Sequence, residues 1–546
     1  MASIGGSVFL ADVDSDYINP STACINPLFS SENEGANRKQ AKSVGQSGAA
    51  LVSIDSGIFS GISEGTNEKD ETVARVTLAD CLACSGCVTS AETVLVTSHS
   101  LEKLKTVLSQ QQSKTLVLSI SPHARASLAR HFNLDLTATH KRLDAYFRRA
   151  GFDYVFDTSS AADIAREEVA AEFFARWRNN KSHTQDDKGG HWKRPRETIS
   201  KSAQKGVIAD SGKDFAYEKQ MGFENQHLPL LTSSCPGWVC YAEKNCAEAL
   251  PYMSTSKSPQ HILGRLLKGS NISKTLTSIK DGAPVYHVTL MPCYDKKLEA
   301  SRKDFANDSG VPDVDLVITP IEVLDMFSEQ GLMNFQALPE GSFPKGDDGS
   351  ILQRLLVGVE RVCGEDHIVT SPYDTTESGS SGGYLDYTLR ATAHKLCLKR
   401  DYSNTLNFRV GRNKDFKVTE LVDDEGKVIL RFAIAFGFRN IQSIVRQIKI
   451  GKCKYDFVEV QACPSGCLNG GAQVRGENRL SSKRILDDVK KIYCGRLGKA
   501  FSTFPSSRLG HIYNDILQDE PYSFKALDWF HTQYHAVPQM SAGSTW

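Results

Sequence analysis

The sequence predicts an α/β protein of two lobes, each with a parallel sheet flanked by helices, preceded by a small N-terminal domain. From residue 115 onward, apolar runs of strand length alternate with segments that suit helices, and this alternation is typical of parallel sheets. Three short cysteine-bearing sequences each follow such an apolar run. They would therefore lie at the carboxyl ends of strands, where open α/β sheets place their ligands.

Length and composition limit the number of domains and the kinds of partner. A chain of 546 residues is too long for one ordinary core, so two or three domains or lobes are expected. Hydrophobic residues make up 40% and charged residues 23%, which is ordinary for a globular protein. Lys plus Arg and Asp plus Glu number 64 each, so the overall charge gives no argument for binding nucleic acid or membrane.

The cysteine content indicates metal binding. The first ten residues lack the basic start and the long apolar stretch of a signal peptide, and no apolar run is long enough to span a membrane. These features predict a soluble intracellular protein. Because the cytosol keeps thiols reduced, its 14 cysteines are better explained by metal or cluster ligation than by disulfides.

Residues 1–112 form the first predicted domain, with an iron-sulfur type cysteine set. Cys81, Cys84 and Cys87 have the C-x2-C-x2-C spacing of ferredoxins, but the fourth cysteine of that pattern is missing. Cys24, between two turn-forming prolines, is the candidate for the fourth ligand. Zinc remains an alternative, as does a three-cysteine site with Cys24 free. Between the two parts, residues 30–70 have the composition of a mobile loop.

Residues 113–226 form the first predicted α/β lobe. Its strands are expected at 115–121 and 154–156, and its helices at 122–132, 142–151 and 161–177. Polar, basic and glycine-rich sequence from 179 to about 225 predicts an insertion or surface loop. A basic run at 193–196 fits a nuclear or nucleic-acid signal, but a solvated loop explains it better.

Residues 227–478 form the second predicted lobe, and 479–546 a tail of short helices. Strands are expected at 227–231, 285–290, 315–319, 428–437 and 456–460, and a helix at 384–398.

The three cysteine junctions carry the chemistry of this lobe. Cys235 follows the first of these strands, Cys293 the second, and Cys463 with Cys467 the last. A helix starting with Pro464 in its first turn would put the last two thiols on one face. Four thiolates suit zinc or a [4Fe-4S] cluster, and ligands dispersed over an α/β body favour the cluster. The alternative is a set of unrelated core cysteines.

Other residues in these junctions have weaker signals. Lys296 would supply charge near an anionic cluster, or else it would lie with Lys297 on a solvated helix face. Glu459, on the strand before Cys463, is expected to be structural rather than catalytic. The remaining cysteines lack partners at ligand spacing and are expected to be buried free thiols: Cys240, Cys246, Cys363, Cys397, Cys453 and Cys494.

The junction sequences T-S-S-C-P-G-W, M-P-C-Y-D-K-K and E-V-Q-A-C-P-S-G-C-L-N-G-G-A-Q resemble the three signature motifs of iron-only hydrogenases, and the likeness extends over roughly residues 75–536. Hydrogenases have a further cysteine, thought to relay protons, where this chain has Ser234. They have a methionine beside the di-iron unit where this chain has Gln461. Their multi-cluster ferredoxin region is reduced here to one cysteine set. These departures argue against hydrogen chemistry.

The same departures, with the N-terminal cysteine pattern, resemble the hydrogenase-like cytosolic iron-sulfur assembly factors, the nuclear prelamin A recognition factor-like family. This resemblance implies two [4Fe-4S] clusters: the first on Cys24, Cys81, Cys84 and Cys87, the second on Cys235, Cys293, Cys463 and Cys467. It implies no hydrogenase activity.

The resemblance also implies partners: a P-loop NTPase scaffold, a late targeting complex with a WD40 propeller protein, and apoprotein clients, with no membrane and no direct nucleic-acid contact. It implies a cytosolic location and leaves the nucleus open as a second one. The terminal Trp546 is better explained as part of a frayed tail than as a targeting signal, because Ser544 and Thr545 fit such a signal poorly.

Overall fold

The computed structural model describes residues 96 and 98–537 with gaps, the longest of which are 183–226, 341–358 and 495–508. All described residues belong to one compact unit, Thr89–Trp546. The predicted N-terminal cluster ligands Cys24, Cys81, Cys84 and Cys87 lie outside the described residues. None of the described helices is both long and apolar enough to cross a membrane.

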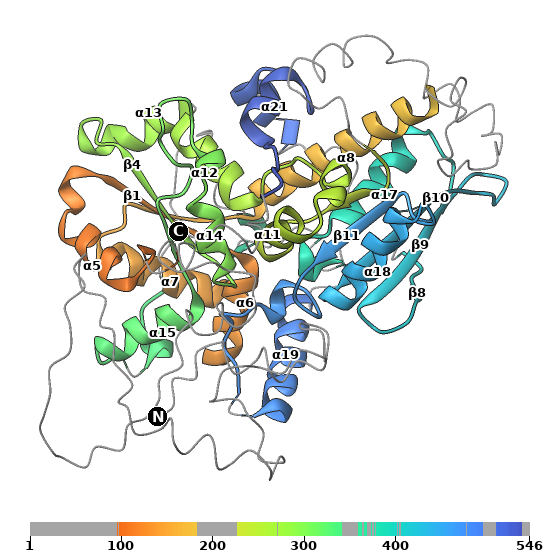
Figure 1. The fold of residues 1–546 in the computed structure, drawn as a ribbon. Coiled ribbons are helices and arrows are strands. Elements are labelled where there is room, and N and C mark those ends of the chain that lie inside the picture. The colour runs from red at the N-terminus through yellow and green to blue at the C-terminus, as the bar shows by residue number, and fades with distance from the viewer. Residues whose placement is uncertain are drawn as a thin grey trace, which may run out of the picture. The chain divides into compact units, whose positions relative to one another are not determined.

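The first sheet is wholly parallel and has the strand order β2-β1-β4-β5 (Figure 1). The strands are β1 (Thr115–Ile120), β2 (Tyr154–Asp157), β4 (Val285–Leu290) and β5 (Leu316–Ile318). Every residue of β1 is buried, as expected for a central parallel strand covered on both faces. Leu118 is in register with Val155 on one side and Val288 on the other. The expected strands at these positions are therefore confirmed.

The chain between residues 227 and 478 contributes to both sheets. The sequence assigned β4 and β5 to the second lobe together with β3 (Leu230–Thr232). In the structure β4 pairs with β1, and β5 pairs with β4, so both strands complete the first sheet, whereas β3 lies in the second. An apolar run predicts that a strand forms, but it does not specify which strand will be its neighbour.

The second sheet is mixed, with the order β3-β11-β10-β9-β8. Its parallel part consists of β3, β11 (Phe457–Gln461) and β10 (Val428–Phe436), and β9 (Phe416–Val422) and β8 (Arg409–Val410) extend it in antiparallel orientation. The last two strands were not expected. Because β8 is exposed and β9 is only partly buried, their sequences lack the apolar run that marked the others. A separate antiparallel hairpin joins β6 (Val359–Val362) to β7 (Glu365–Ile368).

A core of buried apolar side chains joins the two sheets. It includes Val117 of β1, Phe432 of β10 and Phe457 of β11, and its largest helical contributions come from three long helices. These helices are α8 (Ser159–Ser182), α12 (Pro259–Gly269) and α17 (Tyr384–Lys395). Alternate residues of β1, such as Leu116 and Leu118, face a second core on the opposite side of the sheet. That core includes α5 (Leu101–Ser109), α6 (Pro122–Phe132), α7 (Leu136–Ala150) and α15 (Pro320–Glu329).

The remaining helices of four or more residues lie at the strand ends, on the second sheet and in the C-terminal segment (Figure 1). They are α11 (Pro236–Asn245), the 3-10 helix Ala247–Tyr252, α13 (Asn271–Thr277), α14 (Asp295–Ala300), α18 (Phe438–Lys449), α19 (Arg479–Cys494), a π-helix (Ile512–Leu517) and α21 (Phe524–Phe530).

Several helix boundaries differ from those expected. Helix α7 begins at Leu136 because the Asp135 carboxylate accepts hydrogen bonds from the backbone amides of Thr137 and Ala138 in the first turn. Helix α8 runs on to Ser182, into the segment expected to be an insertion, and residues 183–226 lie outside the described part. The tail includes one helix of 16 residues, α19, besides the short ones expected.

Candidate metal centre

The first cysteine junction has the expected strand-turn-helix form. Cys235 follows β3, is buried, and is the N-cap residue of α11, with Pro236 at the first helical position. The Cys235 backbone amide donates to the Ser233 hydroxyl at 3.1 Å. That hydroxyl donates in turn to the Val460 carbonyl at 2.6 Å. Ser233 therefore ties this junction to β11, the strand that leads into the third junction.

The second junction packs directly against the first. Cys293 is buried between β4 and α14. A side chain added at Gly237 in α11 would come within 3.3 Å of the Asp295 carboxylate at the start of α14. The two helices are therefore in close contact, which brings Cys235 and Cys293 to the same edge of the two sheets.

The third junction does not start an α-helix, and the expectation of one is wrong. After β11 the chain runs as a loop, with only a short 3-10 turn at Cys467–Asn469. Ser465 and Gly466 have positive φ angles, 63° and 79°, which are incompatible with a right-handed helix. Cys463 and Cys467 are therefore separated by a left-handed bend rather than stacked on one helical face.

Contacts from other elements hold this loop in place. The Ala472 amide donates to the Pro292 carbonyl at 3.1 Å, and a Cβ at Gly470 would lie 2.4 Å from the same oxygen. The Gln473 side-chain amide donates to the backbone carbonyls of His123 in α6 and of Cys467, at 3.0 and 3.2 Å. The loop thus joins the second cysteine junction to the first helix after β1.

The four cysteines form one electrostatic group. Burial raises the pKa of the Cys235 and Cys293 thiols well above the usual range, and nearby cysteines add to the effect. Burial also raises the pKa of the Cys467 thiol to about 12, again with a contribution from Cys463. Every pair among the four interacts in this way. Without a cation these thiols stay protonated, and a bound metal is what makes thiolates stable in such a place.

This donor set fits an iron-sulfur cluster. Four cysteine sulfurs are the usual ligands of a [4Fe-4S] cluster, and each binds a different iron atom, so they are spaced around the cluster. In the part of the chain that the structure describes, no group of three or more His, Cys, Asp or Glu is placed to hold a single metal ion. Cys235, Cys293, Cys463 and Cys467 would hold the cluster, which would supply iron-thiolate bonds joining the two sheets.

The two lysines after Cys293 are buried, so the expectation of a solvated helix face is wrong. Lys296 pairs with Glu299 at 2.7 Å, and its positive charge favours the thiolate form of Cys467. Lys297 pairs with Glu322 and donates to the backbone carbonyl of His99 at 2.6 Å. Lys296 thus supplies charge to the cysteine group, the other expectation for it, while Lys297 joins α14 to α15 and to the segment before α5.

Ser234 and Gln461, the two junction residues expected to depart from the hydrogenase motifs, have definite contacts. The Ser234 hydroxyl and the phenol of Tyr384 form a hydrogen bond. The Gln461 amide donates to the Ser381 carbonyl at 3.1 Å, and its oxygen lies 3.7 Å from the Cys467 sulfur, within range of a thiol hydrogen bond. Gln461 therefore links the third junction to the turn before α17.

Glu459 is fully buried, in agreement with the structural role expected. Its carboxyl group accepts hydrogen bonds from the Ser381 hydroxyl and, at 2.7 Å, from the Leu385 amide. Burial raises the pKa of this carboxyl to about 7. Glu459 therefore connects β11 to the N-terminus of α17.

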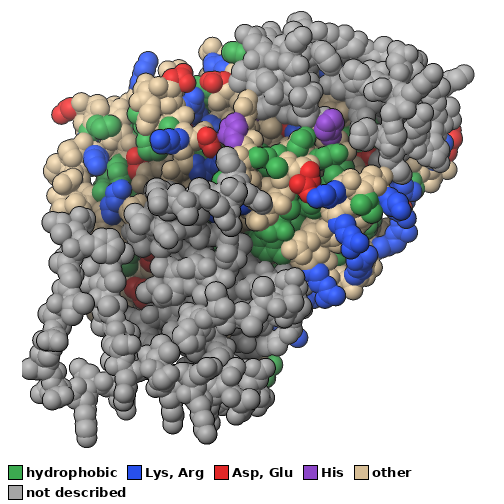
Figure 2. Space-filling view, viewed as in Figure 1, with side chains coloured by type: hydrophobic (Ala, Val, Ile, Leu, Met, Phe, Trp, Pro, Cys, Tyr) green, Lys and Arg blue, Asp and Glu red, His purple; other side chains and the backbone are tan. Residues whose placement is uncertain are grey.

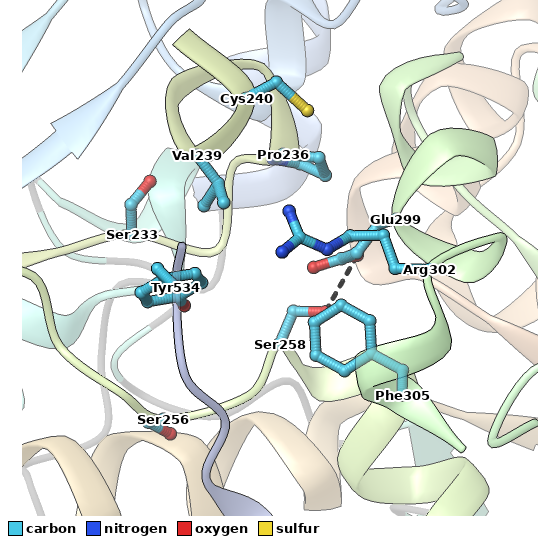
Figure 3. Close-up of a pocket in the computed structure, with 10 residues that line it drawn as sticks. All are labelled: Ser233, Pro236, Val239, Cys240, Ser256, Ser258, Glu299, Arg302, Phe305 and Tyr534. Atoms are coloured by element: carbon cyan, nitrogen blue, oxygen red, sulfur yellow. Dashed lines mark hydrogen bonds between the residues drawn. The ribbon is translucent and has the colours of Figure 1, made fainter. Parts of the chain in front are cut away.

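A small cavity lies beside the first two junctions, lined by Ser233 and Pro236 of the first, Glu299 of the second, and Tyr534 of the C-terminal segment (Figure 3). The Ser258 hydroxyl donates to the Glu299 carboxylate at 3.0 Å across it. The accessible volume of about 10 Å³ corresponds to one water molecule, so this cavity is too small for an organic substrate.

Of the other cysteines, Cys246 and Cys453 are buried, as expected, whereas Cys397 is exposed in a left-handed turn. Asp295 was not predicted as a site residue, yet burial raises the pKa of its carboxyl group and its charge acts on both Cys235 and Cys293. Its place two residues after Cys293 was a usable signal. Ser381 and Gln473 were also missed, and no local pattern marks them.

Comparisons with known proteins identify relatives with the same fold. The family model described as "Iron only hydrogenase large subunit, C-terminal domain" matches residues 114–185 and 201–471, which include all four cysteines of the group. A variant of [FeFe]-hydrogenase HydA1 from Chlamydomonas reinhardtii superposes with a TM-score of 0.56 at 24% identity, covering 78% of this chain and 95% of that one. A structure concerned with oxygen inactivation of [FeFe]-hydrogenase gives 0.57 at 25% identity, covering 79% and 98%.

Curated relatives match the whole chain. "Cytosolic Fe-S cluster assembly factor narfl" of Xenopus tropicalis is 38% identical over 555 residues, covering 100% of this chain and 99% of the relative. "Cytosolic iron-sulfur assembly component 3" of Rattus norvegicus is 36% identical over 556 residues, with the same coverage. "Probable cytosolic Fe-S cluster assembly factor narfl" of Dictyostelium discoideum is 36% identical, covering 96% and 95%.

Proposed function

Because this chain belongs to the family of cytosolic iron-sulfur cluster assembly factors that share the iron-only hydrogenase fold, we propose that it acts in cytosolic iron-sulfur protein assembly. It binds two [4Fe-4S] clusters and mediates the transfer of assembled clusters to cytosolic and nuclear apoproteins. The observation that carries this proposal is the electrostatic group of Cys235, Cys293, Cys463 and Cys467.

The two sites have different roles in this proposal. In the site of Cys235, Cys293, Cys463 and Cys467 the first two cysteines are buried and the last two are partly buried, and this site is mainly structural. The site of Cys24, Cys81, Cys84 and Cys87 is the exchangeable one. In transfer, client thiols replace the thiolates of this chain, and the protons lost by the client thiols end on the chain's cysteines. Iron and sulfide keep their oxidation states, so no reductant is needed.

The contacts of Ser234 and Gln461 support a role without hydrogenase catalysis. A serine hydroxyl is a much weaker acid than a thiol, and this one is paired with Tyr384, so it is poorly suited to relay protons. Gln461 places a polar amide, engaged with Ser381, where hydrogenases have a methionine. An active iron-only hydrogenase is the alternative, since the fold is the same.

The proposed partners are a P-loop NTPase scaffold that precedes this chain in the assembly sequence, a late targeting complex with a WD40 propeller protein, and apoprotein clients. The proposed location is the cytosol, with the nucleus as a second compartment for clients.

Iron and acid-labile sulfide analysis of protein purified without oxygen tests the proposal. About eight irons and eight sulfides per chain, the content of two such clusters, are expected. Zinc without sulfide would contradict both iron-based functions. About two irons beyond the sulfide count, with infrared bands of bound CO and cyanide, would instead indicate a di-iron unit and hydrogenase chemistry.

Cysteine variants test the roles of the two sites. Cys24→Ala is expected to abolish cluster transfer to an apoprotein and to leave the buried site loaded. Cys463→Ala is expected to lower the iron content and the stability of the protein. The assignment of roles is wrong if Cys24→Ala leaves transfer unchanged while Cys463→Ala abolishes it.

A further inference from the structure

One face of the second sheet has a surplus of positive charge. The exposed side of α18 presents Arg439, Arg446 and Lys449, and this helix has no acidic residue. Lys449 pairs with Glu248 at 2.9 Å. Within the described residues, neither Arg439 nor Arg446 forms an ion pair with a carboxylate. The chain as a whole has equal numbers of acidic and basic residues, so this surplus is local.

The turn between β8 and β9 extends this charge. Arg412 lies 3.5 Å from the Ser443 hydroxyl of α18, and Asn413 and Asn440 exchange hydrogen bonds of 3.0 and 3.1 Å. These contacts fix the exposed Lys414 beside the helix. We call Arg412, Lys414, Lys417, Arg439, Arg446 and Lys449 the basic face.

A third element adds charge to this face at one end. Burial lowers the pKa of Lys490 in α19, and repulsion from Lys414 and Lys417 lowers it further, while Asp415 and Asp487 offset part of this repulsion. Since like charges repel, holding them together costs free energy that an anionic partner would recover. Figure 2 shows Lys and Arg side chains gathered over the region where Figure 1 labels α18, β8 and β9.

The basic face connects to the cluster loop. The Asp415 carboxylate, in the same turn as Lys414, accepts hydrogen bonds from the Ser465 amide at 3.0 Å and from the Ser465 hydroxyl at 3.3 Å. Ser465 lies between Cys463 and Cys467. A partner on the basic face would therefore contact the element that holds this loop.

The apolar residues nearby favour a protein partner over nucleic acid. Val410 is 63% exposed and Ile450 is 55% exposed, one beside the turn and the other at the end of α18. Aliphatic side chains among charges are typical of protein interfaces, whereas surfaces that bind single-stranded nucleic acid add exposed aromatic rings for stacking. No exposed aromatic residue occurs within the described span 406–456 that includes this face.

We propose that the basic face docks an acidic, carboxylate-rich face of a protein partner. That this partner is a client or another assembly protein rests on the proposed function, but the docking itself does not.

Binding of a fluorescent polyglutamate peptide to the full chain, purified without oxygen with its bound metal, tests the docking. Lys414→Glu, Arg439→Glu and Arg446→Glu together are expected to weaken binding at least about tenfold and to flatten its salt dependence. The control is a second triple variant with the same change in net charge at exposed sites elsewhere: Lys103→Glu, Lys274→Glu and Lys303→Glu. Its affinity for the peptide should stay within about twofold of that of the unmutated chain.

Equal weakening in both triple variants would overturn the proposal, since net charge alone would then explain binding. Tighter binding of a short DNA duplex or of phosphatidylserine vesicles, lost in the basic-face variant, would also overturn it, in favour of nucleic acid or membrane. If the triple Glu variant loses iron, the same three residues are changed to Gln instead. This variant is expected to bind the peptide more weakly than the unmutated chain, and unchanged binding would contradict the proposal. The iron and sulfide content of the unmutated chain tests the proposed function separately.

Discussion

Cys235 and Cys293 are positioned by regular secondary structure, whereas Cys463 and Cys467 are positioned by an irregular loop. The first two each lie between a strand and the helix that follows, where backbone hydrogen bonds fix the chain. The loop with the other two depends on glycines and on contacts from α6, the second junction and the β8–β9 turn. The positions of Cys235 and Cys293 therefore depend on the sheets, and those of Cys463 and Cys467 on contacts between distant segments. Single substitutions around the loop should therefore reduce stability and iron content more than substitutions at the first two junctions.

The largest effect is expected where the loop meets the second junction. In Gly470→Ala the new Cβ would lie 2.4 Å from the Pro292 carbonyl oxygen, so the backbone must move. We expect a loss of at least about 3 kcal/mol in the free energy of unfolding and a lower iron content. Gly471→Ala is the matched control, because its Cβ would meet no atom within 4 Å. Denaturant midpoints and iron analysis measure both, and similar losses in the two variants would contradict the close contact.

A pH-dependent effect is expected on β11, which leads into the loop. The pKa of Glu459 is raised from 4.5 to about 7 in the folded protein, so folding takes up a proton between these values. The contribution of Glu459 to the free energy of unfolding is fully present below pH 4.5. It decreases as the pH rises from 4.5 to 7 and stays constant above pH 7. The difference is about 3 kcal/mol. Glu459→Gln should lose this dependence, and identical pH profiles of unfolding for variant and wild type would contradict it.

A smaller effect is expected at the β8–β9 turn. Asp415→Ala removes the acceptor for the Ser465 amide and hydroxyl, at a cost of about 1–2 kcal/mol, and should speed iron loss to a chelator. Asp415→Asn keeps the accepting oxygen and is the matched control, with iron loss near the wild-type rate. If both variants lose iron equally fast, the charge of Asp415 matters rather than its hydrogen bonds.

The regular half of the site could be predicted from the sequence. The apolar runs at β1 and β4 have strand length and are buried, and Pro122 marks the first residue of α6 as expected. Because Cys235 and Cys293 directly follow such runs, their location at strand ends followed from local pattern alone. The motifs also carried the family resemblance, which the comparisons confirm.

The irregular half could not be predicted in the same way. Pro464 favoured a helix start, but nothing local in the sequence shows that Ser465 adopts a left-handed conformation, which is supported by Asp415 from fifty residues earlier. The burial of Lys297 depends on Glu322, which follows a different strand. Local sequence determines which element forms, and long-range contacts decide its neighbours and the charges it can bury.

The smallest effect is expected at the regular junction, in Ser233. Ser233→Ala leaves the Cys235 amide and the Val460 carbonyl without this hydroxyl. We expect a loss of only about 1 kcal/mol in the free energy of unfolding, because the strand and helix on either side still fix Cys235. Ser278→Ala, which removes an exposed hydroxyl bonded to the Thr275 carbonyl, is the control and should leave the denaturant midpoint unchanged. Iron retention separates the two halves of the site: it should stay near the wild-type value in Ser233→Ala and fall in Asp415→Ala. Equal iron loss in these two variants would mean that side-chain contacts position all four cysteines alike.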